Sequence, residues 1–435
     1  MSLTRQLIEL IRSKPISRKD LDDAALFTLD AVAAAYAGSA TPVGAILRQW
    51  ANSSELDDKR RALLMGALTH ITETDDLHRA SVTHPGCVVV PAALSLGEKT
   101  GASSDQILRA ILQGFEAMCR IGAAVGPTHY KVWHNTATCG PFGSAMAAAS
   151  LLSLSDAQTL DALGNAGTQS SGFWQFMETG AMSKHLHAGR ASESGLLAAE
   201  LAQQGFTGPP QILEGAKGMF AGMCVDPIPA NIMKDPDEPW QLSLTSIKPW
   251  PSCRHTHPII DCALELQGKL EGRSIDRVEV KTYQAALDVC DRVEPASEYE
   301  AKFSLYHTAA IALLDGEVGL ASFNDTARQR SAALRRKTSI NIVDPFASNY
   351  PESWGAEVIV FTESGETLQT SRKDCKGDPE LALNASEMRA KADGLLRYGG
   401  LSETDSNALC EAILSMPGTE GQSKVFENFI RHCRD

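Results

Sequence analysis

The sequence predicts a mainly α protein in which a large all-helical domain carries a smaller α+β lid domain, inserted before the C-terminal helices. Alanine- and leucine-rich segments with apolar residues every three or four positions predict helices along most of the chain. After about residue 268 the pattern changes to short alternating and β-branched runs, which predict strands. A chain of 435 residues also exceeds one typical hydrophobic core. We therefore expect residues 1–267 and 381–435 to form the helical domain and residues 268–380 the lid.

Capping residues, helix-starting prolines and helix-ending glycines mark the expected boundaries in the helical part. Serine followed three residues later by glutamine, at 103–106 and 155–158, has the spacing of a capping box. The expected helix starts are Ser17, Pro42, Ser103, Pro141 and Ser155, and the expected ends include Gly38 and Gly205.

Four runs in the α+β part predict strands, and the last two flank a turn at Glu363-Ser364-Gly365, which predicts a hairpin. The expected strands are 277–283, 339–343, 356–362 and 366–371, with helices at 303–316 and 323–337 and three C-terminal helices at 386–399, 402–416 and 423–435.

Composition excludes several classes of partner. The formal net charge of -13 and the pI near 5.4 argue against nucleic acid and against an anionic membrane, since both require a basic surface. We see no apolar run long enough for a membrane span, and charges interrupt the first fifteen residues, so a cytoplasmic protein is expected. The ten cysteines show no C-x-x-C pair, which is typical of reduced thiols.

Four polar clusters stand at or near expected helix starts, where backbone N–H groups attract anions. They occupy residues 75–84, 131–134, 184–190 and 248–261. Their candidate catalytic residues are Asp75, Asp76, His84, His134, Lys184 and Lys248, and their candidate substrate-binding residues are Arg79, His187, Arg190, Arg254 and His255. Histidine, lysine and carboxylate together suit proton abstraction next to a carboxylate, because imidazole serves as the base and lysine stabilises the enolate.

Other interpretations of these residues remain open. Asp75 and Asp76 could cap a helix, and the remaining histidines at 70, 129 and 432 are expected to be structural. Cys253, His255 and His257 resemble part of a metal site, which would suit a metal-dependent hydrolase, but no matched further ligand follows and we expect no metal. A non-catalytic helical scaffold is the second alternative. We find no P-loop, nucleophile elbow or dinucleotide fingerprint.

Five segments in collinear order resemble motifs of the MmgE/PrpD family. "HITETDDLHRASVTHPG" resembles its His-x-x-Asp-x-Asp-Asp and Thr-His-Pro elements, and "MSKHLHAGRA" its Lys-x-x-His-x-Gly-x-Ala element. The segments that carry the resemblance are 70–98, 133–152, 182–220, 247–266 and 300–318. They span nearly the whole chain, which is far more specific than any single motif.

The resemblance implies a dimeric enzyme without a cofactor, in which a helical domain and a lid enclose a di- or tricarboxylate. Family reactions include dehydration of 2-methylcitrate, decarboxylation of cis-aconitate and epimerisation of iminodisuccinate. By motif the family's active-site positions fall on Asp75 or Asp76, His84, His134, Lys184 and Lys248, with the aromatic lid position on Tyr306 or His307. We expect a dehydratase, with a decarboxylase or an epimerase as alternatives.

Several departures bear on the substrate. Glu73 and Leu77 differ from the residues common in the family, and Gly86 stands where serine is usual. The short interval between Asp76 and His84 lacks the insertion of the methylcitrate dehydratases and so argues against methylcitrate.

Overall fold

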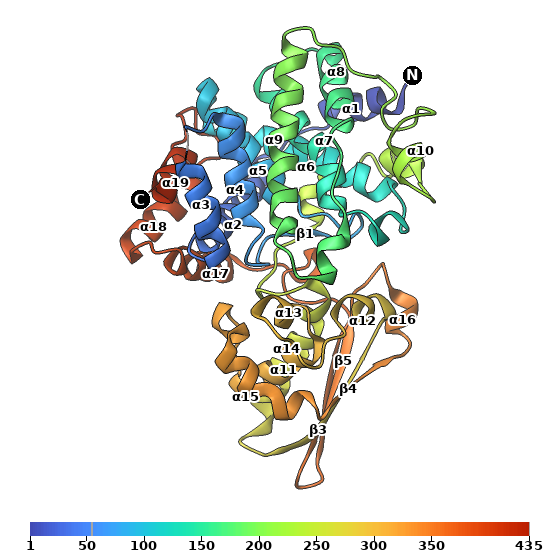
Figure 1. Ribbon diagram of the computed structural model, residues 1–435, viewed down its shortest axis with the longest axis vertical. Helices are drawn as coiled ribbons and strands as arrows, with labels where there is room; N and C mark the ends of the chain where they lie inside the picture. The colour runs from blue at the N-terminus through green and yellow to red at the C-terminus, as the bar shows by residue number, and fades with distance from the viewer. Residues whose placement is uncertain (54, 435) are drawn as a thin grey trace. The chain divides into compact units, whose positions relative to one another are not determined.

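The computed structural model describes residues 1–53 and 55–434 and is mainly α, as predicted (Figure 1). Its contacts divide the chain into two compact units. The helical unit comprises residues 1–71, 75–246 and 384–435, and the mixed unit comprises residues 72–74 and 247–383. The helix expected over 423–435 is observed as α19, and its last residue, Asp435, lies outside the described residues.

Alanine-rich helices build the helical unit. They are α1 (Leu3–Ser13), α2 (Arg18–Ser39), α3 (Pro42–Asn52), α4 (Asp58–Thr69), α5 (Gly86–Thr100), α6 (Ser104–Ala124), α7 (Asn135–Leu151), α8 (Asp156–Gly167), α9 (Ser183–Gln203), α10 (Met219–Met223), α17 (Ala385–Tyr398), α18 (Glu403–Leu414) and α19 (Val425–Arg434). Helix α7 packs against α5, α6, α8 and α9, and its small side chains allow this close approach. The C-terminal α17 packs against α2.

Local capping explains where several helices begin. Ser17, Ser103 and Ser155 each accept a hydrogen bond from the backbone N–H three residues on, and the acidic or amide side chain at that third position reciprocates. These three predicted starts are confirmed, as is Pro42 at the start of α3. No single helix among the described residues is long and apolar enough to cross a membrane. Helices α2 and α3, which are joined at a sharp bend, together have the length and composition of a membrane span, and this is the sole basis for considering them as one.

The predicted helix start at Pro141 is wrong. Helix α7 begins at Asn135, so Pro141 lies within it although proline removes one helical hydrogen bond. The residues before Pro141 are buried against the neighbouring helices, and this tertiary packing keeps the segment helical. His134 is therefore the N-terminal cap residue of α7.

A pair of two-residue strands was not predicted. Strand β1 (Leu77–His78) pairs antiparallel with β2 (Thr245–Ser246), which fixes the segment between Asp75 and α5 within the helical unit. Two residues are too few for the alternation that identifies a strand in sequence.

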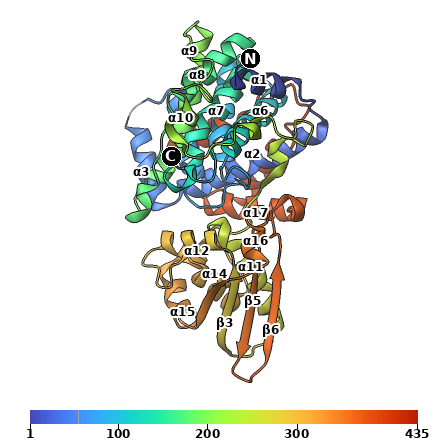
Figure 2. The ribbon, with the colours of Figure 1, turned by 90° about the vertical axis from the view of Figure 1, so that its right-hand side faces the viewer.

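The mixed unit is built on a four-stranded sheet in the order β4-β3-β5-β6. Its strands are β3 (Ile275–Thr282), β4 (Thr338–Ile342), β5 (Ala356–Thr362) and β6 (Thr367–Arg372), and its helices are α11 (His257–Leu270), α12 (Gln284–Cys290), α13 (Glu298–Lys302), α14 (Leu305–Asp315), α15 (Asp325–Arg335) and α16 (Phe346–Asn349). Strand β4 runs parallel to β3, and the other pairs are antiparallel. Helix α11 packs on β5 and β6 and against α14, as Figure 2 shows. The four predicted strands and the hairpin are confirmed.

Candidate active site

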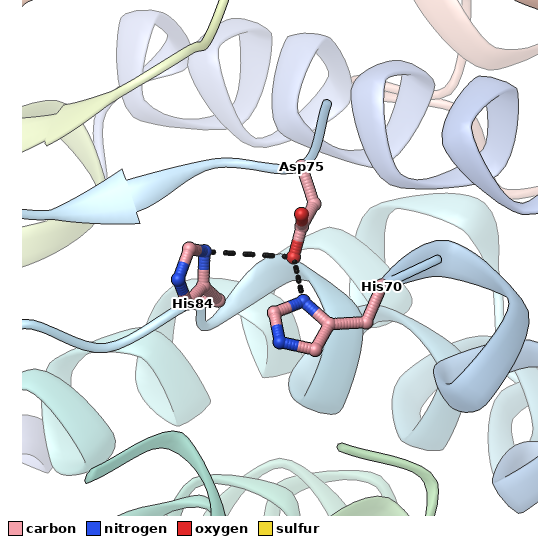
Figure 3. Close-up of side chains that lie close together, drawn as sticks. All are labelled: His70, Asp75 and His84. Atoms are coloured by element: carbon pink, nitrogen blue, oxygen red, sulfur yellow. Dashed lines mark hydrogen bonds and ion pairs between the residues drawn. The ribbon is translucent and has the colours of Figure 1, made fainter. Parts of the chain in front are cut away.

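Two histidines converge on one carboxylate in the helical unit (Figure 3). The Asp75 Oδ2 atom lies 2.6 Å from Nδ1 of His70 and 3.6 Å from Nδ1 of His84. His70 and Asp75 are fully buried, whereas the His84 side chain is 12% exposed. The ring centroids of the two histidines are 4.8 Å apart. This arrangement brings a carboxylate, which can accept a proton, together with two imidazoles, which can transfer one.

Hydrogen bonding fixes the tautomers of both rings. A carboxylate and a carbonyl oxygen only accept, so Nδ1 of His70 donates to Asp75, and Nδ1 of His84 donates to the Asp76 carbonyl oxygen at 2.5 Å. In the neutral rings the lone pair is therefore on Nε2. The His70 Nε2 atom is buried and has no hydrogen-bond partner among the described residues.

Chain geometry explains how distant positions meet here. His70 ends α4, and the chain returns through Asp75 into strand β1. His84 stands two residues before α5, and its backbone N–H donates to Thr136 of α7 at 3.1 Å. The Asp76 carboxylate accepts the first backbone N–H of α5, that of Gly86, with both oxygens at 3.0 Å.

Glycine at position 86 permits this cap. A Cβ added there would lie 3.0 Å from both Asp76 oxygens, tighter than an ordinary contact. The alternative interpretation of Asp76 as a helix-capping residue thus matches its contacts, whereas Asp75 contacts imidazoles.

A second pair of imidazoles adjoins the first. The His134 ring stacks on that of His70, with centroids 5.6 Å apart and 16° between the planes. Its Nδ1 lies 3.3 Å from Nδ1 of His187, which α9 carries one turn after Lys184. Burial is the main cause that lowers the pKa of His134 well below its ordinary value and that of His187 to about 4, and the charge of Lys184 contributes to both. Both rings are therefore neutral near pH 7.

Two candidate arginines of the helical unit lie at more open positions. Arg190 is about half exposed and pairs with Glu193 on its own helix. Arg79 is partly buried, and its charge contributes to lowering the pKa of His78 to about 4, for which burial is the main cause.

The sequence-based selection of site residues did not include His70 and His185, which lie beside the selected residues. His70 was assigned a structural role, yet it contacts Asp75 and stacks on His134. His185 is buried with its ring 6.5 Å from that of His70. The signal for His70 was present, since this residue opens the first segment that resembles the family motif.

The remaining candidates belong to the mixed unit. The buried Lys248 Nζ donates to the Glu73 carbonyl oxygen at 3.3 Å and lies 3.6 Å from the Glu73 carboxylate. Arg254 pairs with Asp378. His255 stacks on Trp354 at 4.4 Å, and burial lowers its pKa to about 3.

The two candidates for the aromatic position differ in environment. Tyr306 is partly buried and donates to Asp291 at 2.9 Å, and burial followed by this carboxylate raises its pKa to about 12. His307 is fully buried, with Nε2 donating to the Ser322 carbonyl oxygen and Nδ1 bonded to the Ser331 hydroxyl. Both nitrogens of His307 are thus engaged inside the mixed unit, which favours a structural role for it.

Two sets of candidate residues carry side chains that can ligate a metal. Among the described residues, Cys253, His255 and His257 do not bring ligand atoms together; His255 bonds to Tyr283, and His257 bonds to the Ser252 carbonyl. The ligand atoms of His70, Asp75 and His84 do lie within 4.8 Å of one another, so they could hold a cation. In the structure, Nδ1 of His70 donates to Asp75 and Nδ1 of His84 donates to the Asp76 carbonyl oxygen.

The chain matches the MmgE/PrpD N-terminal domain over residues 6–230 and the MmgE/PrpD C-terminal domain over residues 250–414. It is 28% identical over 346 residues to the cis-aconitate decarboxylase of Aspergillus terreus, covering 70% of each chain. It is 25% identical over 370 residues to the human cis-aconitate decarboxylase, covering 78% of this chain and 75% of the relative. These two domain matches cover most of the sequence, and the chain therefore belongs to the MmgE/PrpD family.

Proposed function

We propose that this protein is a lyase that transfers a proton at a carbon next to a carboxylate of a di- or tricarboxylic acid. The observation that carries the proposal is the cluster in which His70 and His84 contact Asp75 and His134 stacks on His70, with the buried Lys184 near by. Imidazoles held in one tautomer serve as acid and base, and a buried lysine stabilises an enolate far more than it would in water.

The environments of the three rings suggest different roles. His134 has a pKa too low for an efficient base near pH 7, so it is suited to donating or accepting a hydrogen bond as a neutral ring. His70 is fully buried and held by Asp75. His84 is partly exposed, and its Nδ1 is fixed by the Asp76 carbonyl, so Nε2 can serve as the base towards a bound substrate. Lys184 would bind a substrate carboxylate.

Decarboxylation is the first reaction to test, because the similar curated enzymes are named cis-aconitate decarboxylases. Dehydration, the reaction expected from the sequence, is the second. Dehydration removes a proton next to a carboxylate and expels hydroxide, whereas decarboxylation releases carbon dioxide and adds a proton to the carbanion that remains. An acid-base cluster supports either reaction. Lys248 and Tyr306, from the mixed unit, remain proposed participants, as do a closing lid and a homodimer.

The proposal predicts solvent exchange at the carbon next to the carboxylate. The protein is incubated in heavy water with citrate, cis-aconitate or succinate, and loss of the proton signal is followed by NMR while release of carbon dioxide is measured. We expect exchange with at least one acid, and a loss of roughly a hundredfold or more in His84→Ala, the typical contribution of a general base.

His129→Gln is the matched control, because His129 is bonded to Met223 and Thr138 outside the cluster and should leave exchange unchanged. Exchange should also survive treatment with EDTA, whereas a metal-dependent enzyme would lose it. If acids bind to the wild type and none exchanges its proton, the proposed proton transfer is wrong.

A further inference from the structure

Cys253 and Cys290 are neighbouring thiols within the mixed unit. Cys253 is the residue before the 3-10 helix Arg254–Thr256, and Cys290 ends α12. These two elements pack against each other, and Nδ1 of His255 bonds at 2.8 Å to the hydroxyl of Tyr283, the residue before α12. The fold thus brings together two cysteines that are distant in the sequence, and a hydrogen bond joins their sulfur atoms.

The two thiols differ in acidity. The hydrogen bond from Cys290 is the main cause that lowers the pKa of Cys253 below its ordinary value, although burial acts against this, and the backbone N–H of His255 also donates to the Cys253 sulfur. Burial is the main cause that raises the pKa of Cys290 well above its ordinary value. Cys253 therefore carries more of the thiolate form, which is the nucleophile in thiol oxidation, and Cys290 stays protonated beside it.

Access to solvent also distinguishes Cys253. The structure describes all ten cysteines as free thiols, and of these Cys224 and Cys253 are partly exposed while the others are buried. The Cys224 sulfur lies 3.6 Å from Nδ1 of His129, and burial raises the pKa of Cys224 to about 11. A small oxidant from solvent can reach both exposed thiols, but Cys253 combines this access with a lowered pKa and a neighbouring thiol.

A hydroxyl group adjoins the pair of thiols. The Tyr299 hydroxyl is buried and has no hydrogen-bond partner among the described residues. Burial is the main cause that raises its pKa well above the ordinary value, and the nearby charges of Glu73 and Cys253 contribute. The group therefore stays protonated. A protonated donor beside the Cys253 sulfur can bind one oxygen of a small polar oxidant.

We infer that Cys253 and Cys290 form an oxidation site, at which a hydroperoxide converts the two thiols to a reversible disulfide. The Cys253 sulfur attacks one oxygen of the hydroperoxide, the O–O bond breaks, and the leaving oxygen takes up a proton to give water or an alcohol. The Cys290 sulfur then attacks the sulfur of the resulting sulfenic acid, the S–O bond breaks, and water leaves. The two thiols lose two electrons and two protons in total, and one hydroperoxide is reduced.

The known requirements of a redox-sensing cysteine support this assignment. Such a cysteine is acidic, accessible to solvent and next to a second cysteine that resolves its sulfenic acid. Cys253 meets each requirement, with Cys290 as the resolving residue. The inference is independent of the proposed lyase reaction, because the thiols are oxidised without the carboxylic acid.

The test treats the reduced, full-length protein with hydrogen peroxide near pH 7 and maps its cysteines by mass spectrometry. We expect a peptide pair that joins Cys253 to Cys290 and that dithiothreitol separates again, with a loss of two reactive thiols per chain. A disulfide between other cysteines overturns the inference, as does oxidation of other thiols while Cys253 and Cys290 remain reduced. This measurement on the wild type requires no variant to fold.

Dimedone, which traps sulfenic acids, identifies the thiol that reacts first. In Cys290→Ser the sulfenic acid has no resolving thiol, so dimedone should accumulate on Cys253. In Cys253→Ser no adduct should form on Cys290. Thermal unfolding checks that both variants are folded. An adduct on Cys290 without one on Cys253 would contradict the assigned order and overturn the inference.

Cys224 is the matched control, because it is also partly exposed but has a pKa of about 11, whereas that of Cys253 lies below the ordinary 9.0. This difference gives Cys253 at least roughly a hundredfold more thiolate, and the lower nucleophilicity of the more acidic sulfur offsets about tenfold of it. Dimedone should therefore label Cys253 at least about tenfold faster than Cys224 in Cys290→Ser. Cys224→Ser should form the disulfide at the wild-type rate. Equal labelling of Cys224 and Cys253 would show that Cys253 is not activated, and the inference would be wrong.

Discussion

Asp75 differs from its neighbour Asp76 in what its carboxylate contacts. Oδ2 of Asp75 accepts from His70 and lies near His84, whereas both oxygens of Asp76 face the backbone N–H of Gly86. A carboxylate that orients an imidazole stabilises the imidazolium form during proton transfer. One that faces a backbone N–H stabilises a helix. The two adjacent aspartates thus make different kinds of contact.

Asp75→Asn should therefore lower turnover strongly while leaving the fold intact. The amide can donate to Nδ1 of His70 and favour the wrong tautomer, a change that costs about 10⁴-fold in the best-studied triad, so a loss of about 10² to 10⁴-fold is expected. The rate of proton exchange and the thermal unfolding temperature are measured together. Asp161→Asn is the control, because Asp161 accepts a backbone hydrogen bond from Gly208 at 3.0 Å, away from the histidine cluster. Exchange within about threefold of wild type in Asp75→Asn would remove Asp75 from the mechanism.

Sequence reasoning selected His84, His134 and Lys184 as catalytic candidates and assigned His70 to the structural histidines. Its selection followed spacing near helix starts, and His70 instead ends a helix, so its proximity to Asp75 depends on the return of the chain through Ile71–Thr74. The different contacts of Asp75 and Asp76 could not be predicted either, because both have the same chemistry and only the direction of each side chain distinguishes them.

The start of α5 depends on a residue distant from it in the chain. Its cap residue, Pro85, has no side-chain hydrogen bond, and Asp76 supplies an acceptor from before strand β1. The capping boxes of α2, α6 and α8 are local and were predictable from sequence. The start of α7 was not, because tertiary packing retains Pro141 within the helix. Local signals thus located helix ends, and long-range contacts decided the exceptions.

Removing the acceptor for α5 should destabilise the helical unit. Asp76→Ala leaves the buried Gly86 N–H without its partner and removes a negative charge from a helix N-terminus, so a loss of about 1–3 kcal/mol is expected. Asp76→Asn retains an acceptor oxygen and should lose less. Urea unfolding of both variants measures the difference, with the midpoint and the slope fitted separately. Equal stability of Asp76→Ala and wild type would show that this hydrogen bond does not stabilise α5.

Both units contain histidines that burial keeps neutral. Burial lowers the pKa of His78 to about 4 in the helical unit, and of His255 to about 3 and His307 to about 4 in the mixed unit. Each of these rings has an ordinary value of 6.5 once the chain unfolds. Mild acid is thus expected to lower the stability of the whole molecule through several buried histidines rather than through one.

The free energy of unfolding should therefore depend on pH in mild acid. Between about pH 4 and 6.5 the unfolded chain binds a proton at such a histidine and the folded chain does not, so the free energy of unfolding falls as pH is lowered through this window. The stabilisation is fully present above the unfolded pKa and is lost as pH falls towards the folded one. Each histidine contributes a slope of up to about 1.4 kcal/mol per pH unit.

His307→Gln tests it, because glutamine can still donate to the Ser322 carbonyl oxygen that His307 Nε2 contacts but does not titrate. Urea unfolding of the mixed unit, followed by the fluorescence of its buried Trp354, should give a slope between about pH 5 and 6 that is smaller than wild type by about 1.4 kcal/mol per pH unit. Above about pH 7.5 His307 is neutral in both the folded and the unfolded chain. Any remaining difference in the free energy of unfolding between wild type and His307→Gln should therefore be independent of pH. Identical slopes in the acidic window would mean that His307 binds its proton equally well in both states, and burial would then not be what controls its titration.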